Sequence, residues 1–149
     1  IGVSVDKQLN DEEATKRGKE IRKAYIAAIP GLKELLEAVQ KASERGFLYG
    51  LDHRRIGVDS RHKSLNYLLQ SSAATIAKRW MVLANEHLPK TAHQLAFVHD
   101  ELQFECKEEE AEDLKFLLEL TAVQAGEYYN MRCPVAAESK SGANWAEVH

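Results

Sequence analysis

The chain has 149 residues, of which 44% are hydrophobic and 29% are charged, and its formal net charge is −3. This composition is typical of a soluble globular protein, and no apolar run approaches the ~18 residues that a membrane span requires. Two cysteines exclude a disulfide framework and a cysteine-rich zinc site. Since the first residue is not Met and the start is charged rather than signal-like, we expect a cytoplasmic chain that was trimmed, processed or cut from something longer.

The first third of the chain predicts two helices. Asn10 and, three residues later, Glu13 form a capping-box pattern, which predicts a helix that begins at this point. An apolar stripe at helical spacing follows until Pro30 interrupts it. A second helical pattern then begins at Leu32, and Gly46 is expected to end it.

A hairpin and a long helix are expected next. Hydrophobic residues alternate between residues 47 and 58, with a turn at Asp52, His53 and Arg54. Apolar side chains then recur every three or four residues over 65–83, which predicts a helix of about six turns.

The last third predicts a second hairpin, another helix and a final strand. The hairpin covers residues 95–106, and its tip is at residues 98–101. A helix over residues 108–129 and a strand over residues 134–138 follow. Helices that alternate with short hairpins predict an α+β fold.

The turn of the second hairpin carries His99, Asp100 and Glu101. Turns often contain Asp for backbone reasons alone, so this sequence also has a purely structural interpretation. Adjacent carboxylates on a rigid turn, however, suit a hard divalent cation such as Mg²⁺, which prefers oxygen ligands. One turn cannot complete such a site, so at least one further carboxylate has to come from elsewhere.

A basic cluster precedes the long helix. It consists of Arg54, Arg55, Arg61, His62 and Lys63. A solvated basic loop is a common feature, and the functional alternative is a surface that contacts nucleic-acid phosphates. His62, Asn66 and Gln70 are spaced by four residues, so they are expected to share one helix face. Such amides can contact the minor groove, where most base edges are hydrogen-bond acceptors.

Four stretches of the chain resemble the C-terminal part of family A DNA polymerases, the bacterial polymerase I type, and most closely their phage replicative members. Residues 96–101 are similar to polymerase motif C, which is a hairpin of the palm subdomain. Residues 65–74 are similar to the palm helix whose Asn and Gln contact the primer-template minor groove. Residues 51–55 are similar to the family's LDGRR-like turn, and residues 142–149 are similar to its terminal segment.

The resemblance implies a role for each candidate residue. Asp100 is expected to be the motif C catalytic aspartate that binds the metal ions, Glu101 an auxiliary acid near the metals, and His99 a contact to the primer terminus. The expected contacts to the duplex near the nascent base pair are Gln70, Asn66 and His62. Phosphate contacts or palm-surface charges are expected for Arg54, Arg55, Arg61 and Lys63. His53 replaces the usual Gly of its turn, which predicts a positive φ and some strain.

The resemblance assigns residues 1–46 to the end of the fingers and residues 47–149 to the palm. The family's second catalytic aspartate (motif A) and its nucleotide-binding fingers helix (motif B) have no counterpart in the chain. We therefore expect a C-terminal fragment or small subunit of a split DNA-directed DNA polymerase, inactive without an N-terminal portion that carries motifs A and B. Its expected cofactors are two Mg²⁺ ions. Its other expected partners are primer-template DNA and a deoxynucleoside triphosphate (dNTP), in a phage-infected bacterial cell and without a membrane.

Two other functions stay open. The first is a non-catalytic DNA-binding or assembly module with a palm-like shape, for which replacement of Asp100 would change nothing. The second is a metal-dependent nuclease built around Asp100 and Glu101. Such a nuclease needs more acidic ligands, and the candidates on expected strands are Glu105 and Glu138.

Overall fold

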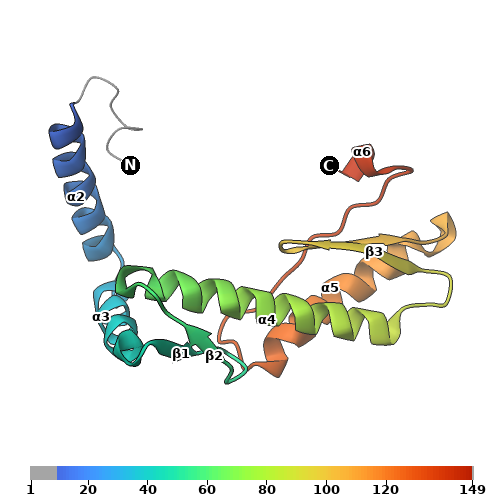
Figure 1. Cartoon of the computed structure of the whole chain (residues 1–149). Helices are drawn as coiled ribbons and strands as arrows, with labels where there is room; N and C mark the ends of the chain where they lie inside the picture. The colour runs from blue at the N-terminus through green and yellow to red at the C-terminus, as the bar shows by residue number, and fades with distance from the viewer. Residues whose placement is uncertain (1–9, 149) are drawn as a thin grey trace. The chain divides into compact units, whose positions relative to one another are not determined.

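The computed structural model describes residues 10–148, in which helices alternate with two short hairpins (Figure 1). The chain divides into two compact units. The first consists of the described part of residues 1–48 together with 57–65, and the second of residues 49–56 together with the described part of 66–149. The predicted α+β class is confirmed. No helix within residues 10–148 is long and apolar enough to cross a membrane.

The first unit contains the two predicted N-terminal helices. They are α2 (Asp11–Ala28) and α3 (Leu32–Ala42), and α3 continues into the 3₁₀ turn η1 (Ser43–Arg45). The capping box is confirmed, because the Asn10 side chain accepts from the backbone N–H of Glu13 at 2.9 Å and the Glu13 carboxylate accepts from the N–H of Asn10 at 3.3 Å. Gly46 ends this region as predicted, with a left-handed φ of 83° that suits glycine.

The first hairpin pairs β1 (Phe47–Tyr49) with β2 (Arg55–Gly57). In its loop, the N–H of Gly50 donates to the carbonyl of Arg54 at 2.8 Å, and the N–H of His53 donates to the carbonyl of Gly50 at 3.0 Å. His53 has a φ of 62°, so the positive φ predicted at this position is confirmed.

The long helix α4 (Ser64–His87) follows the 3₁₀ turn η2 (Arg61–Lys63), and from Asn66 on it belongs to the second unit. The other long helix of this unit is α5 (Ala111–Tyr128), which follows the turn η3 (Glu108–Glu110). The indole N–H of Trp80 on α4 donates to the carbonyl of Leu118 on α5 at 2.9 Å. The guanidinium of Arg79 lies 3.7 Å from the ring centroid of Tyr128. The buried cluster of this unit comprises Ala84, Ala92, Leu114 and Leu118, with Phe104 and Cys106 packed against it.

The second hairpin pairs β3 (His93–Val98) with β4 (Glu101–Glu105) in antiparallel register. Val98 lies opposite Glu101, so the tip is at the predicted residues. The register shifts between Gln94 and Ala96, which indicates a β-bulge. Because Phe104 packs into the buried cluster, the hairpin is anchored against α5.

The prediction of a strand over residues 134–138 is wrong. These residues form no strand, and the chain reaches the short helix α6 (Trp145–Val148) without regular structure. A strand needs a neighbour that accepts its backbone hydrogen bonds, and within residues 10–148 each hairpin forms a separate two-stranded sheet. The segment is held differently: the N–H of Ser139 donates to the Glu119 carboxylate at 3.0 Å, and Val135 packs closely over Gly126 of α5.

Candidate catalytic hairpin and nucleic-acid interface

The turn between β3 and β4 has two central residues, His99 and Asp100. His99 has a φ of 57°, whereas Asp100 is not among the residues with a positive φ. This sign pattern is that of a type II′ turn, which matches the twist of the two strands and usually has Gly at its first central position. A left-handed residue with a side chain costs about 1–2 kcal/mol, so the structure places backbone strain directly before Asp100.

The two carboxylates of the turn differ in their surroundings. Asp100 is exposed, and its carboxylate has no hydrogen bond or ion pair with another residue in the described part of the chain. Glu101 is half-buried and accepts from the side-chain amide of Gln103 at 2.9 Å. Asp100 therefore presents a carboxylate that an external ligand can use, while Glu101 is held by its own strand.

The carboxylates of this turn are the right type of ligand for a magnesium ion, but there are too few of them to hold one. Carboxylate oxygens are the ligands that Mg²⁺ prefers, and Asp100 and Glu101 supply them on adjacent residues. Between residues 10 and 148, however, no group of three His, Cys, Asp or Glu residues is arranged to hold a metal ion. A metal bound at this turn would therefore need a further carboxylate from outside the described residues.

Asn66 and Gln70 lie four residues apart on α4, in the same unit as the hairpin. Both side chains are exposed, and neither amide bonds to another described residue. The small polar residues that follow are committed to their own helix, since the Ser72 and Thr75 hydroxyls donate to carbonyls four residues earlier at 2.8 Å. The two amides are thus the groups on this stretch of α4 that are available for a ligand.

His62 lies in η2, which belongs to the first unit, and it is exposed. Asn66 and Gln70 belong to the second unit. That His62 shares one helix face with these two residues therefore stays a prediction. Lys63 is also exposed in η2 and has no ion pair within residues 10–148.

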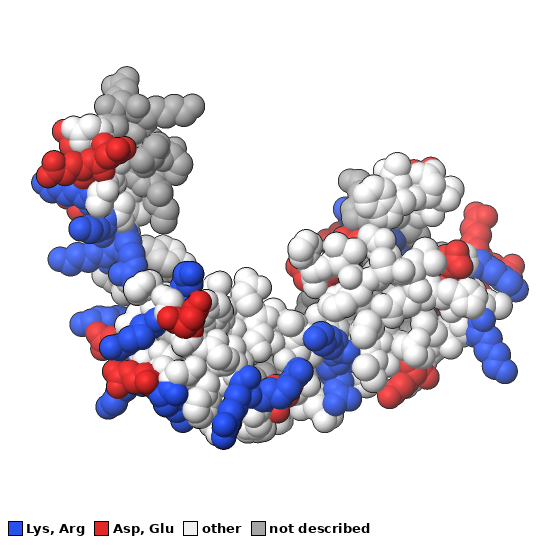
Figure 2. Space-filling view, in the orientation of Figure 1, with Lys and Arg blue, Asp and Glu red and all other residues white. Residues whose placement is uncertain are grey.

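Two of the arginines predicted as phosphate contacts have carboxylate partners in the chain. Arg61 pairs with Glu44 at 2.9 Å, and the Arg54 guanidinium bonds to the Asp52 carboxylate. Burial alone would raise the pKa of Asp52, but the side-chain and backbone hydrogen bonds from Arg54, together with its charge, outweigh it and lower that pKa. Arg54 and Asp52 therefore stabilise the turn of the first hairpin. Arg55 is exposed on β2, and Lys and Arg side chains are visible on the surface of both units (Figure 2).

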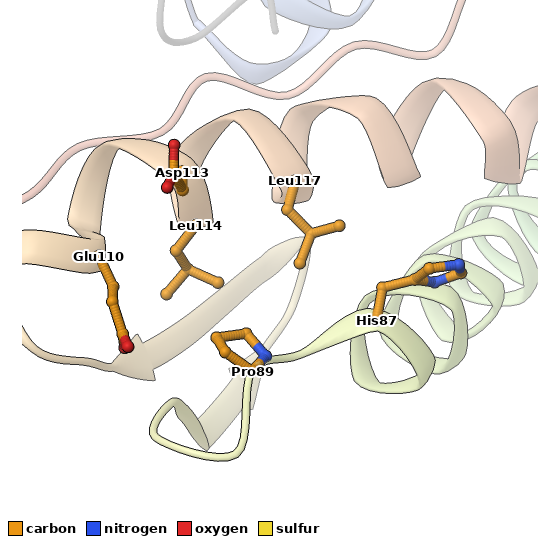
Figure 3. Close-up of a pocket in the computed structure, with 6 residues that line it drawn as sticks. All are labelled: His87, Pro89, Glu110, Asp113, Leu114 and Leu117. Atoms are coloured by element: carbon orange, nitrogen blue, oxygen red, sulfur yellow. The ribbon is translucent and has the colours of Figure 1, made fainter.

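A hollow that sequence reasoning did not identify lies between the end of α4 and the start of α5 (Figure 3). Its lining residues are His87, Pro89, Glu110, Asp113, Leu114 and Leu117. Two of its polar groups already have partners: the Nδ1 atom of His87 is 2.8 Å from the carbonyl oxygen of Leu83, and the Thr91 hydroxyl donates to Glu110. No sequence motif marks this hollow, because its residues come from two stretches that are about 20 positions apart, residues 87–89 and 110–117.

The two cysteines differ in exposure. Burial, together with the nearby charge of Glu110, raises the pKa of the Cys106 thiol, so this thiol is protonated near neutral pH and is a poor nucleophile. Cys133 is exposed. Of the extra ligands considered for a nuclease, Glu105 is exposed at the end of β4, and Glu138 lies outside any strand.

Comparison with known proteins identifies the family. Residues 3–147 match the family described as DNA polymerase family A. The chain belongs to this family. It is 32% identical to a DNA-directed DNA polymerase of Enterobacteria phage T3 and 31% identical to that of Escherichia phage T7, in each case over 90% of this chain and 23% of the relative. DNA polymerase I of Aquifex aeolicus is 28% identical over 99% of this chain and 26% of the relative.

A solved structure gives the same assignment for the fold. The POL domain of Pol1 from M. smegmatis, in complex with DNA primer-template and dNTP, matches with a TM-score of 0.65 and 26% identity. The match covers 79% of this chain and 23% of that chain. The family A chain thus spans about a quarter of the length of these relatives.

Proposed function

We propose that this chain is the motif C portion of a DNA-directed DNA polymerase and that Asp100 supplies one of the carboxylates required for nucleotidyl transfer. The observation that carries the proposal is the exposed Asp100 carboxylate at a strained two-residue turn, without a partner in the described part of a family A chain. A carboxylate that bonded to a neighbouring Lys or Arg would be occupied, whereas this one is open to a cation.

The other residues of the hairpin and α4 have positioning roles in this proposal. The Glu101 carboxylate is an auxiliary acid beside Asp100, and His99 contacts the primer terminus. Asn66 and Gln70 donate amide hydrogens to minor-groove acceptors and hold the duplex without reading its sequence. His62, Arg55 and Lys63 are further DNA contacts. Arg54 and Arg61 bond to the carboxylates of Asp52 and Glu44, so they rank lower as contacts to phosphate.

Asp100 and Glu101 would hold the magnesium ions together with a carboxylate of motif A. When bound, two such ions activate the primer 3′-hydroxyl and stabilise the leaving pyrophosphate. Because no complete ligand group is present within residues 10–148, we propose that synthesis requires a polypeptide portion that carries motifs A and B. That portion, primer-template DNA and dNTP are the proposed partners.

Replacement of Asp100 by Ala tests the proposal. The 149-residue chain is combined with a portion that carries motifs A and B, and primer extension and DNA binding are measured separately. Asp100→Ala is expected to lower the extension rate by at least about 10²-fold, as for other removed transition-state contacts, while DNA binding persists. Full extension by the Asp100→Ala variant would instead favour a non-catalytic module.

Glu105→Ala provides the matched control, because Glu105 is an exposed carboxylate of the same hairpin. It is expected to leave extension unchanged. Equal losses in both variants would show that the hairpin is merely sensitive to substitution and would contradict the specific role of Asp100. Extension by the 149-residue chain alone would contradict the need for the partner portion.

A further inference from the structure

Helix α2 carries a dense group of basic residues that the proposed active site does not use. Five residues within eight positions are basic, and all of them are exposed. They are Lys16, Arg17, Lys19, Arg22 and Lys23. Figure 2 shows Lys and Arg side chains gathered along this helix, beyond the acidic side chains of its first turn.

Three of these residues form a stripe along the helix, which we call the lysine stripe. Lys16, Lys19 and Lys23 are spaced by three and four residues and therefore lie on one side of α2. The buried Ala14 and the half-buried Ile21 lie on the other side. The stripe therefore faces away from the part of α2 that packs against protein.

Interactions among the described residues do not explain the lysine stripe. Arg17 pairs with Glu20 at 3.4 Å, but the three lysines have no ion pair or hydrogen bond with any residue in the described range. Cations stabilise a helix near its C-terminus, yet the last turn of α2 contains no basic residue. Stabilisation of the helix dipole therefore does not account for the stripe.

Three exposed lysines on one side of a helix suit an anionic partner, and their spacing indicates what kind of anion fits. The lysines are about 4.5 and 6 Å apart along the axis, so an extended array of negative charges fits better than a single anion. Lysine binds phosphate as a flexible point charge without reading bases.

We propose that the lysine stripe of α2 binds the phosphodiester backbone of the DNA substrate independently of its sequence. This inference rests on the proposed function, since it takes DNA as the substrate. It adds a contact surface on α2, apart from the DNA contacts assigned to α4 and the basic cluster.

The salt dependence of DNA binding tests the inference. Binding of the full 149-residue chain to a fluorescein-labelled single strand and to a blunt duplex of the same length is followed by anisotropy over a series of NaCl concentrations. In the triple variant Lys16→Gln, Lys19→Gln, Lys23→Gln, the slope of log Kd against log salt is expected to decrease by about 0.7–0.9 for each lost phosphate contact. The DNA form with the larger decrease is the one that the stripe binds.

The matched control is the triple variant Lys41→Gln, Lys90→Gln, Lys140→Gln. These lysines are also exposed and have no ion pair within residues 10–148, and their replacement changes the net charge equally. A steeper loss in the stripe variant than in the control supports the inference. An unchanged slope, or an equal loss in the control, would overturn it.

A polyglutamate competitor separates DNA from an acidic protein partner. If the stripe variant lost affinity for labelled polyglutamate but kept the DNA slope, the inference would be overturned in favour of a protein partner. Asp100-dependent extension by the combined polymerase is measured in parallel. Its persistence beside an unchanged slope would overturn this inference and leave the proposed function intact.

Discussion

Residue 99 in the β3–β4 turn has to meet two separate requirements. Its φ of 57° is a backbone requirement that glycine meets without cost and that histidine meets only under strain. The proposed contact to the primer terminus is a side-chain requirement that glycine cannot meet. Histidine at position 99 is therefore explained if its contact to the primer terminus matters more than the stability of the turn. Substitutions can separate the backbone requirement from the side-chain requirement.

Substitution of His99 distinguishes these requirements. His99→Gly is expected to change the free energy of unfolding little, because relief of strain is offset by about 0.4–1 kcal/mol of greater freedom in the unfolded chain. His99→Val is expected to be less stable than His99→Gly by about 1–2 kcal/mol, since a β-branched residue fits a positive φ poorly. Urea unfolding measures both variants, and both should slow primer extension in the combined polymerase.

His93→Gly is the control for this comparison, because His93 is an exposed histidine in β3 without a positive φ. It is expected to destabilise the hairpin by about 0.5–1 kcal/mol, as glycine does in strands. Equal stability of His99→Gly and His99→Val would show that the backbone at this turn does not select the residue.

At the scale of secondary-structure elements, Gly126 determines how the segment after α5 is held. A Cβ atom at this position would lie 2.7 Å from Cγ2 and 2.9 Å from Cβ of Val135. Real Cβ contacts are not so short, so the segment around Val135 approaches α5 as closely as it does only because residue 126 lacks a side chain. Packing against a helix thus replaces the strand pairing that the sequence suggested.

Gly126→Ala is expected to destabilise the second unit. Overpacking typically costs about 1–3 kcal/mol, and the higher helix propensity of alanine returns at most about 1 kcal/mol. Urea unfolding followed by Trp fluorescence measures the net change. Gly57→Ala is the control, because a Cβ atom at Gly57 meets nothing within 4 Å.

A second substitution tests whether the clash is the cause. Val135→Ala removes the Cγ2 atom that would lie 2.7 Å from the Cβ atom added by Gly126→Ala, so it should cost less in the Gly126→Ala background than in the wild-type chain. Strictly additive costs would indicate that the two positions do not interact and that the loss has another origin.

Local signals were sufficient for most elements. The capping box at Asn10 and the glycine stop at Gly46 depend on residues within three or four positions of each other, and the structure confirms both. The hairpin tip at His99 and Asp100 is also confirmed, because the alternation of the two strands fixes where they turn. The family was recognised from four other short stretches, residues 51–55, 65–74, 96–101 and 142–149, and the family match confirms it.

Contacts between residues distant in sequence could not be predicted. The pairing of Arg61 with Glu44, 17 positions away, is one example; whether Arg61 also contacts phosphate stays a prediction. The strand predicted over residues 134–138 is the wrong element: these residues have no neighbouring strand, and Val135 packs on Gly126 instead. The roles of Asp100, Asn66 and Gln70 depend on DNA and a partner portion, so they stay predictions.

At the scale of the whole molecule, buried apolar residues are distributed unequally between the two units. The contiguous buried cluster of Ala84, Ala92, Leu114 and Leu118 belongs to the second unit. Buried residues of the first unit's described part are scattered among its elements: Ala14, Val39, Ser43, Leu48 and Ser64. Since burial of apolar area is the main source of stability, the first unit should unfold more easily.

Two spectroscopic signals distinguish the two units. Trp80 and Trp145, the two tryptophans of the chain, both belong to the second unit. Far-UV circular dichroism also detects α2 and α3, which belong to the first. In a Trp145→Phe variant, fluorescence reports only Trp80, whose indole donates to Leu118 across the α4–α5 contact.

Urea titration of this variant is expected to give two transitions that do not coincide. Ellipticity should begin to fall at a lower urea concentration than Trp80 fluorescence changes, because the helices of the first unit melt while the α4–α5 contact persists. Superimposable curves that fit one two-state transition with a common midpoint would contradict the unequal stability. The Gly126→Ala substitution sharpens the test, since it should shift the Trp80 transition and leave the early part of the ellipticity change in place.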